Sequence, residues 1–288
     1  MQRRSFLTTL GSLASLAAMS LGCSRAATSS AAGERIVSLG GALTELVYAL
    51  GLGERLVGVD SSSVWPESAR ALPQVGYQRK ISAEGVIALA PSLVLHSDAA
   101  GPASALARLR EAGIPLAEFA DPRDVAGARA RIEALAARLD RVERGRELID
   151  SLDAELARLP EVADEQRPRV LFLYARGADT LLVAGRSTAA AAMIELAGGR
   201  NALELDDFRP LSAEAVLAAA PELLLVTSRG LDSVGGSAGL LALPGIAQTP
   251  AGRNARILAL DDLALLGFGP RTGATLHELA AALHPDEV

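Results

Sequence analysis

The sequence predicts an α/β fold, in which two small α/β lobes with central sheets are joined by a single long α-helix. A fifteen-residue pattern occurs twice, as ISAEGVIALAPSLVL at residues 81–95 and LSAEAVLAAAPELLL at residues 211–225, 212 − 82 = 130 positions apart. In each copy a serine precedes a short helix, a proline ends it and an apolar strand follows. Because helices that alternate with buried strands are typical of α/β folds, the two copies predict two related lobes.

The N-terminal lobe is predicted over residues 33–122. A strand over residues 35–39 runs through a glycine pair into a helix that reaches residue 50. Residues 57–59 form a second short strand, and the first copy of the repeat follows.

The C-terminal lobe is predicted over residues 161–288. It repeats the order of the first lobe, with a strand at residues 170–174 and a helix at residues 187–197 that a second glycine pair ends. From the glycine that ends the first helix to the repeated serine is 29 residues in the N-terminal lobe and 13 in the C-terminal lobe. The N-terminal lobe therefore carries 29 − 13 = 16 extra residues, within residues 61–80.

The linking helix is predicted over residues 123–160. This segment contains no proline before its last residue, and its apolar residues recur at spacings of three and four. A coiled coil is the other interpretation, but Arg146 on the seam and the neighbouring Gly145 argue against it. A helix of this length spans roughly 55 Å, which is enough to cross between lobes and to restrict their motion to small changes.

Residues 1–32 are predicted to be an export signal. Arg3-Arg4 precede an apolar run that reaches Leu21, and small residues follow. The pattern fits a twin-arginine signal and an ordinary secretory signal equally well. No later stretch approaches the roughly 20 uncharged apolar residues that a membrane span needs.

Cys23 is the only cysteine, so no disulfide can form within the chain. Its place at the end of the apolar run resembles a lipoprotein cleavage site, although Ser20 stands where such sites carry a branched apolar residue. Two outcomes stay open. Cys23 is a candidate for lipidation, which would tether the protein, or cleavage after Ala26 or Ala31 removes it.

Composition restricts the class of partner. The chain has 288 residues, half of them hydrophobic, with a net charge of −6, which indicates a globular protein. It has no basic stripe interleaved with aromatic residues, so we expect no nucleic-acid partner. It also has no P-loop, no zinc-type cluster and no HExxH motif.

Several segments resemble helical-backbone substrate-binding proteins of ABC importers, namely ELVYALGLGERLVGV and both copies of the repeat. Within that class, four strings are similar to the haem-binding members of bacterial haemin uptake systems: VGYQRKISAEG, SRGLDSVGG, LLALPGIAQTPAGRN and DDLALLGFGPRTG. The resemblance implies a periplasmic protein that binds ferric haem b as cargo in a groove between two lobes. It also implies delivery of haem to an ABC transporter permease with its ATPase, and we expect a monomer.

Tyr77 lies within the extra residues of the N-terminal lobe and matches the tyrosine that ligates haem iron in the resembled proteins. A phenolate is a hard oxygen donor suited to ferric iron. Free tyrosine ionises at about pH 10, so a neighbouring cation helps, and the resemblance assigns Arg79 to this support. From the residues alone, a tyrosine at this position is more often a packed or surface residue. Tyr174 is the alternative second donor, and no iron role is assigned to the three histidines, His96, His277 and His284.

Arg176 and Arg229 are candidates for contacts with the haem propionates. Each follows a predicted strand, and strand ends face the crevice in α/β lobes. Guanidinium groups pair with carboxylates through two parallel hydrogen bonds. Trp65 and Phe208 are candidates for stacking on the porphyrin, with ordinary packing as the alternative.

Glu84 and Glu214 occupy matching positions in the two copies of the repeat. The resemblance implies that such glutamates dock onto arginines of the permease. A glutamate in the first turn of a helix also has a plain explanation in the helix dipole, worth about 0.3–1 kcal/mol.

Two other functions fit parts of the sequence. A binding protein for a ferric siderophore or cobalamin shares the fold, but it has less need of Tyr77 and Arg79. A serine esterase is the remote alternative, because Ser237 lies in a G-x-S-x-G string with aspartates and histidines after it. Seven residues separate that string from the preceding strand, so the sequence predicts a binding protein and not an enzyme.

Overall fold

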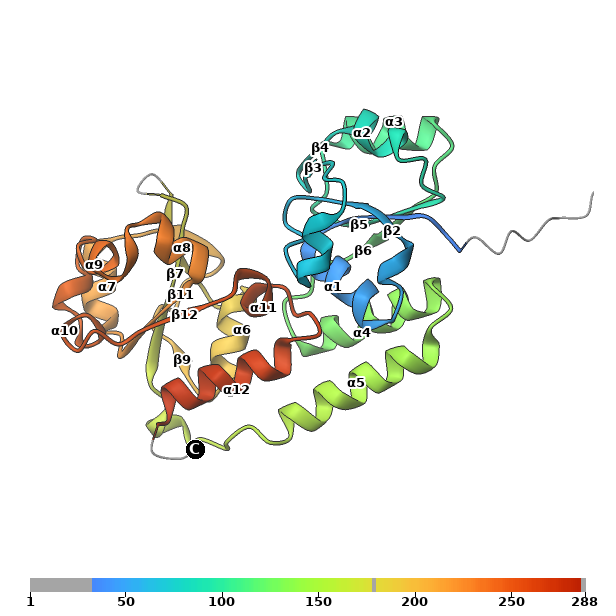
Figure 1. The fold of residues 1–288 in the computed structure, drawn as a ribbon. Helices are drawn as coiled ribbons and strands as arrows, with labels where there is room; N and C mark the ends of the chain where they lie inside the picture. The colour runs from blue at the N-terminus through green and yellow to red at the C-terminus, as the bar shows by residue number, and fades with distance from the viewer. Residues whose placement is uncertain (1–32, 178–179, 286–288) are drawn as a thin grey trace, which may run out of the picture. The chain divides into compact units, whose positions relative to one another are not determined.

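Two sheets, each covered by helices on both faces, form two lobes within residues 34–285 (Figure 1). The structure, a computed structural model, describes residues 33–177 and 180–285. The predicted export signal and Cys23 lie outside the described residues. Among the described residues, no helix has both the length and the apolar character that crossing a membrane requires.

The N-terminal lobe is built on a parallel sheet with the strand order β2-β1-β5-β6. Helix α1 (Gly41–Ala49) packs on one face, and α2 (Ala83–Ala88) and α3 (Ala103–Glu111) pack on the other. The strands are β1 (Ile36–Leu39), β2 (Leu56–Val59), β5 (Leu93–Ser97) and β6 (Leu116–Phe119), and the short helices η1 (Gly53–Arg55) and η2 (Glu67–Ala71) flank β2.

The C-terminal lobe has the strand order β10-β8-β7-β11-β12, and β9 pairs with the start of β7. The strands are β7 (Arg169–Ala175), β8 (Leu181–Ala184), β9 (Arg200–Asn201), β10 (Phe208–Pro210), β11 (Leu223–Thr227) and β12 (Ile257–Leu260). Strands β7, β11 and β12 are parallel, whereas β8 and β10 add an antiparallel edge that the sequence analysis did not predict.

The helices of the C-terminal lobe cover both faces of its sheet. One face carries α6 (Ala189–Leu196) and α12 (Thr272–Leu283), and the other carries α7 (Ala213–Ala219), α9 (Gly236–Leu241) and α10 (Pro250–Arg253). The remaining helices are α8 (Ser228–Ser233), α11 (Asp262–Leu266), η3 (Asp164–Gln166) and η4 (Ile246–Gln248).

The repeat forms the same local structure in both lobes. The Ser82 hydroxyl accepts a hydrogen bond from the Gly85 N–H at 3.1 Å, and the Ser212 hydroxyl accepts one from the Ala215 N–H at 3.5 Å. Each cap begins a short helix that leads to a fully buried strand, β5 in one lobe and β11 in the other. The predicted α/β fold with two lobes is confirmed.

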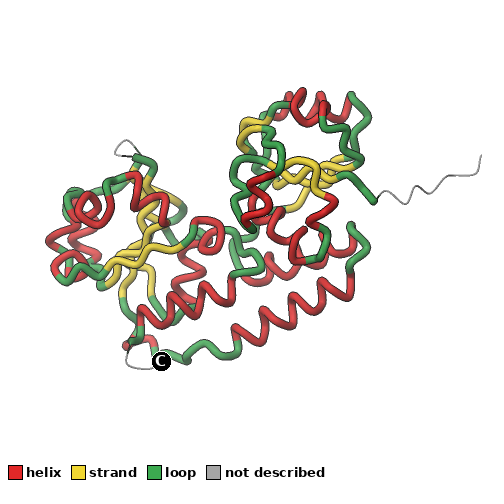
Figure 2. The backbone as a smooth tube through the Cα atoms, in the orientation of Figure 1, coloured by secondary structure: helices red, strands yellow, loops and turns green. Residues whose placement is uncertain are grey.

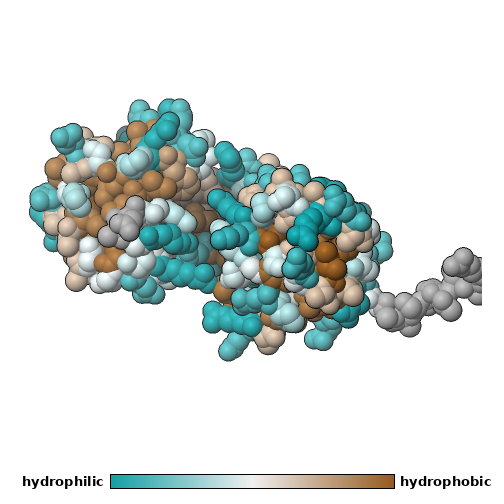
Figure 3. All heavy atoms as spheres, turned by 90° about the horizontal axis from the view of Figure 1, so that it is seen from above, coloured by the Kyte–Doolittle hydropathy of each residue, from teal (hydrophilic) through white to brown (hydrophobic). Residues whose placement is uncertain are grey.

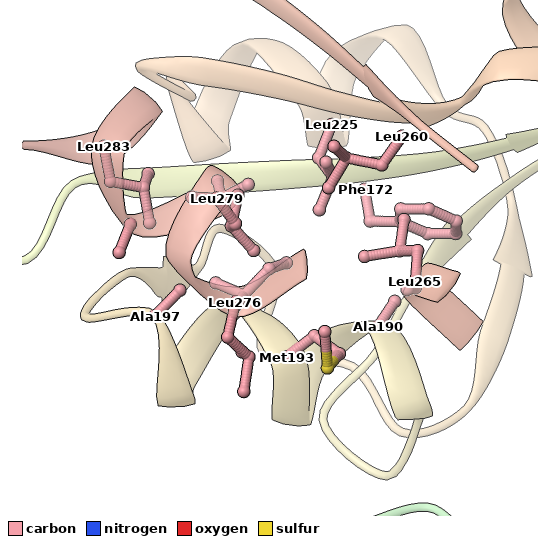
Figure 4. Packing of buried hydrophobic residues seen from close by; sticks show 14 of the residues in the cluster. Phe172, Ala190, Met193, Ala197, Leu225, Leu260, Leu265, Leu276, Leu279 and Leu283 are labelled. Atoms are coloured by element: carbon pink, nitrogen blue, oxygen red, sulfur yellow. The ribbon is translucent and has the colours of Figure 1, made fainter. Parts of the chain in front are cut away.

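The largest core lies between the C-terminal sheet and helices α6 and α12 (Figure 4). Phe172 of β7 and Leu225 of β11 meet Met193 of α6 and Leu276 of α12, and all four side chains are fully buried. Burying a side chain of this size stabilises the fold by about 1.5–3 kcal/mol relative to exposure. The core therefore fixes the positions of the strand ends.

The segment between the lobes forms two helices, so the prediction of one continuous helix is wrong. Helix α4 (Val125–Arg138) ends where Asp140 adopts a left-handed conformation with φ of 54°, and α5 (Val142–Leu156) then runs back along α4 (Figure 2). A Cβ atom on Gly145 would lie 2.5 Å from the Ala136 Cβ, so glycine allows the close packing of the two helices. Apolar spacing of three and four is found in two paired helices as well as in one long helix, so the spacing alone does not distinguish them.

Both helices reach the cores of both lobes. On α4, Ala128 packs into the C-terminal core and Ile132 packs into the N-terminal core. On α5, Leu152 belongs to the C-terminal core, while Leu148 packs against the N-terminal core. The lobes are therefore joined by a pair of packed helices.

Buried charges cross between the lobes beside this pair of helices. Arg271, which precedes α12, donates to both carboxylate oxygens of Glu45 on α1, at 2.5 and 3.1 Å. Arg131 of α4 donates to the carbonyl oxygens of Gly267 at 2.5 Å and Phe268 at 3.0 Å. Burial raises the pKa of Glu45 and lowers the pKa of Arg131 to about 10.

Removing Arg271 should destabilise the protein, because the buried Glu45 carboxylate loses its partner. We expect Arg271→Met to lower the free energy of unfolding by about 3 kcal/mol, and Glu45→Leu in the same chain to recover most of the loss. Urea denaturation followed by circular dichroism measures both changes.

Arg146→Met is the matched control, because Arg146 pairs with Glu143 at 2.6 Å on the exposed surface of α5. Its effect should stay below about 1 kcal/mol. An Arg271→Met variant no less stable than this control would contradict a structural role for the buried pair.

Candidate functional site

A cavity of about 570 Å³ lies between the lobes, within the range of about 300–1,000 Å³ typical of small-molecule sites. Figure 3 shows the molecule hollowed there, with apolar surface on the side of the C-terminal lobe. The carboxyl ends of strands from both sheets supply its lining, as α/β folds favour. The lining residues that follow strands are Gly40, Ser62, Asp121, Arg176, Arg229 and Asp261.

Tyr77 and Arg79 reach this cavity from a tight hairpin of the N-terminal lobe. Strands β3 (Gly76–Tyr77) and β4 (Lys80–Ile81) pair antiparallel, with Gln78 and Arg79 between them. Tyr77 is 46% exposed and lines the cavity together with Arg79. Gly76 has φ of 100°, and a Cβ atom there would lie 2.8 Å from the Lys80 carbonyl oxygen, so the hairpin requires glycine.

A buried carboxylate, Asp60, holds this hairpin in place. It accepts backbone hydrogen bonds from Gln78 at 3.1 Å, Gly40 at 3.0 Å and Ser62 at 3.0 Å. It also accepts from the hydroxyls of Ser62 at 2.6 Å and Ser63 at 2.9 Å. Sequence reasoning missed Asp60, although an acidic residue directly after an apolar strand was a signal that could have found it. Its carboxylate ties together three loops that line the cavity.

The C-terminal lobe presents an aromatic wall to the cavity. The rings of Tyr174 and Phe208 pack edge to face with centroids 6.0 Å apart, and both residues line the cavity. The Arg176 guanidinium lies 4.6 Å from the centre of the Tyr174 ring. Leu182 adds apolar surface to the same side. This wall suits a flat, largely apolar ligand with anionic edges.

Both cations and carboxylates line the cavity. The Arg176 guanidinium donates to Asp262 at 2.8 Å, and the Arg229 backbone N–H donates to the other Asp262 oxygen at 3.4 Å. The side chains of Arg79 and Arg229 form no ion pair with any described residue. The cavity therefore offers guanidinium groups to an anion.

Two further carboxylates of the lining have shifted pKa values. Burial raises the pKa of Asp121, and Arg131 at 3.7 Å offsets only part of that effect. Burial alone would also raise the pKa of Asp261, but hydrogen bonds from the Ala264 N–H and from Arg271 outweigh it and lower the value. Sequence reasoning did not assign Asp121 or Arg123 to the cavity, although both lie within four residues of the end of β6.

The structure brings four of the predicted site residues together, since Tyr77, Arg79, Arg176 and Arg229 all line the same cavity. Phe208 lines it too, whereas Trp65 lies outside the lining and packs 4.9 Å from the Arg271 guanidinium. None of the described histidines lines the cavity. Their ring nitrogens bond elsewhere, to Ser97 from His96, to Glu155 from His277 and to Gly198 from His284.

Glu84 and Glu214 lie apart from the cavity. Each is exposed in the first turn of its helix, α2 or α7. Glu84 pairs with Arg108 at 3.2 Å, and both side chains are largely exposed. The two glutamates keep the equivalence that the repeat predicts.

The hydrolase arrangement is not formed. Ser237 is an exposed residue within α9, and α8 separates α9 from β11. Asp261 caps α11 and pairs with Arg271, while His277 bonds to Glu155. The structure therefore gives Ser237 no strand-to-helix elbow.

Removing the Asp60 carboxylate should destabilise the N-terminal lobe, because five donors lose a buried acceptor. We expect Asp60→Ala to lower the free energy of unfolding by about 3 kcal/mol or more. The control is Asp206→Ala, an exposed aspartate, with a change of about 0.5 kcal/mol or less. Equal unfolding midpoints in urea for the two variants would show that Asp60 does not anchor the loops.

Comparison with proteins of known structure finds close relatives. The chain resembles RhuT from Roseiflexus sp. RS-1, described as a periplasmic haem-binding protein in apo form, with 49% identity and a TM-score of 0.83 over 88% of this chain and 98% of that one. It also resembles BhuT, described as a periplasmic haem-binding protein in complex with two haems, with 43% identity and a TM-score of 0.79 over 87% and 99% of the two chains.

Comparison with curated sequences points to the same family. The vitamin B12-binding protein of Yersinia pestis (strain Pestoides F) is 30% identical over 199 residues, which cover 68% of this chain and 70% of the relative. The family model of periplasmic binding proteins matches residues 36–264. With the two lobes and the cavity between them, these matches show that the chain belongs to the periplasmic binding protein family.

Proposed function

We propose that this protein captures haem in the periplasm and delivers it to an ABC transporter permease for haem and iron uptake. One observation carries the proposal. Tyr77, Arg79, Arg176 and Arg229 line a single cavity between the lobes, in a chain 49% identical to a protein described as haem-binding. The ligand fits the chemistry of this lining, because haem combines a ferric iron, a flat apolar ring and two carboxylates.

Tyr77 is the proposed axial ligand of the ferric iron. Its side chain is half exposed in the cavity wall, so its phenolic oxygen is accessible to a ligand that enters between the lobes. Ferric iron favours an anionic oxygen donor, and Arg79 lines the same cavity as Tyr77. The backbone N–H of Gln78 is tied to Asp60, so the hairpin is positioned before haem binds.

The aromatic wall formed by Tyr174 and Phe208 is the proposed contact for one face of the porphyrin. Arg176 and Arg229 stand at the ends of β7 and β11, where they would pair with the propionates. None of the described histidines lines the cavity, so we propose ligation by a single protein residue, Tyr77.

Glu84 and Glu214 are the proposed docking points for the permease, which works with its ATPase. Both glutamates are exposed, and the repeat places one on each lobe. A monomer with one acidic contact per lobe suits a partner with two basic contacts. We propose that lipidation of Cys23 would anchor the protein if the mature chain keeps that residue.

Cobalamin is the alternative ligand, because a curated relative is described as a vitamin B12-binding protein. That relative is 30% identical over part of the chain, whereas RhuT and BhuT are 49% and 43% identical over most of it. A ligand that brings its own donors would also leave the half-exposed Tyr77 without a role.

Titration with haemin tests the proposed function directly. We expect the protein without its export signal to bind haemin saturably and to show the absorption spectrum of ferric iron ligated by tyrosinate. Tyr77→Phe keeps the ring but removes the oxygen, so it should lose that spectrum and weaken binding by about tenfold or more, or about 1.4 kcal/mol.

Tyr174→Phe is the matched control, because Tyr174 lines the same cavity from the other lobe. It should keep the tyrosinate spectrum. Loss of the spectrum in Tyr174→Phe with retention in Tyr77→Phe would move the ligand to the C-terminal lobe. Absence of saturable haemin binding, together with saturable binding of cobalamin, would favour the alternative ligand.

Reversing the charge of Glu84 or Glu214 should impair delivery without affecting capture. We expect Glu84→Arg and Glu214→Arg each to reduce haem uptake about fivefold, in cells that lack their own copy of the protein. Haemin affinity of the purified variants should stay unchanged. The control is Glu143→Arg on α5, whose side chain is 81% exposed. Uptake equal to that of this control would rule out docking through the two glutamates.

A further inference from the structure

We propose that Asp262 is an internal carboxylate that neutralises Arg176 in the empty cavity and so limits how tightly haem is held. The inference rests on the proposed function and extends it from capture to release. A protein that delivers its ligand must let it go, and the structure holds an anion where an anionic edge of that ligand would pair.

The geometry of Asp262 is that of a carboxylate bound at a ligand site. One oxygen accepts from the Arg176 guanidinium at 2.8 Å, and the other accepts from the Arg229 backbone N–H at 3.4 Å. Asp262 is the first residue of α11, and its side chain is only 15% exposed. This one carboxylate therefore binds the guanidinium of Arg176 and the backbone of Arg229.

Arg176 does not depend on Asp262 for its position. Its guanidinium also donates to the Ala175 carbonyl oxygen at 3.0 Å and lies 4.6 Å from the centre of the Tyr174 ring. These contacts leave the guanidinium in the cavity when the carboxylate is withdrawn. The role of Asp262 is therefore charge compensation and not support of the side chain.

Binding of a propionate to Arg176 would exchange one carboxylate for another. The guanidinium forms the same pair with either anion, so the net gain is smaller than for a free arginine. Asp262 keeps the Arg229 N–H as a partner after the exchange, which makes the reverse step accessible. The internal carboxylate would thus weaken haem binding and speed its release.

Asp262→Asn tests this role, because the amide keeps the shape of the side chain and removes its charge. We expect haem to dissociate about fivefold more slowly, measured by transfer to apomyoglobin, since a partly exposed ion pair is worth up to about 1 kcal/mol. With haem dimethyl ester, which lacks free carboxylates, wild type and variant should release ligand at the same rate. In an Arg176→Ala background, Asp262→Asn should have no effect.

Asp206→Asn is the matched control for net charge. Asp206 pairs with Arg186 at 3.7 Å, and its side chain is 76% exposed outside the cavity lining. It should change the rate by less than twofold. Thermal unfolding of each variant shows whether the fold is retained.

Faster haem release in Asp262→Asn would overturn the inference and make Asp262 a residue that orients Arg176. An equal effect in Asp206→Asn, or an equal effect on the dimethyl ester, would also overturn it, because neither depends on propionate exchange. If the wild-type protein binds no haemin, the proposed function fails and this inference fails with it. If the wild type binds haemin and the variant does not slow release, only the inference fails.

Discussion

The buried pair between Glu45 and Arg271 is the constraint that determines how the two lobes face each other. Both oxygens of a buried carboxylate bind one guanidinium that comes from the other lobe. Moving the lobes apart by a few ångströms would leave the Glu45 charge buried and unpaired, which typically costs several kcal/mol. Arg131, bound to the carbonyl oxygens of residues 267 and 268, adds a second contact of this kind. These buried charges therefore oppose displacement of one lobe relative to the other.

Because this pair holds the two lobes face to face, the cavity between them combines chemical groups from both. The carboxyl ends of strands from two separate sheets meet across it, so the N-terminal lobe supplies Tyr77 and Arg79 and the C-terminal lobe supplies Arg176 and Arg229. The proposed iron ligand Tyr77 and the aromatic wall with its arginines therefore lie on different lobes. Two helices that pack into the cores of both lobes hold these halves together, which favours small motions during ligand exchange. Recognition in this fold is a property of the interface between lobes.

The local signals in the sequence predicted most of the framework. The capped helices after Ser82 and Ser212, and the strands that follow them, form as their patterns indicate because capping and apolar periodicity act over a few residues. The prediction of a single linking helix was wrong, because the same periodicity also describes two helices, α4 and α5, separated by a turn at Asp140. The edge strands β8 and β10 were missed, because short strands are stabilised by their partners across the sheet and not by their own pattern.

The sequence by itself determined the two α/β lobes, the matched positions of Glu84 and Glu214, and the identity of Tyr77 as the residue of most interest. The lobes and the matched glutamates follow from residue type and from spacing along the chain, whereas Tyr77 was identified by its resemblance to the tyrosine of haem-binding proteins. Only the tertiary structure decided that Asp60 anchors the Tyr77 hairpin, that Arg271 joins the lobes by binding Glu45, and that Asp262 binds the Arg176 guanidinium. These partners lie 18, 226 and 86 positions apart, and a carboxylate cannot reveal in sequence which donor it will meet. Burial and strand order bring such pairs together, and both are properties of the folded chain.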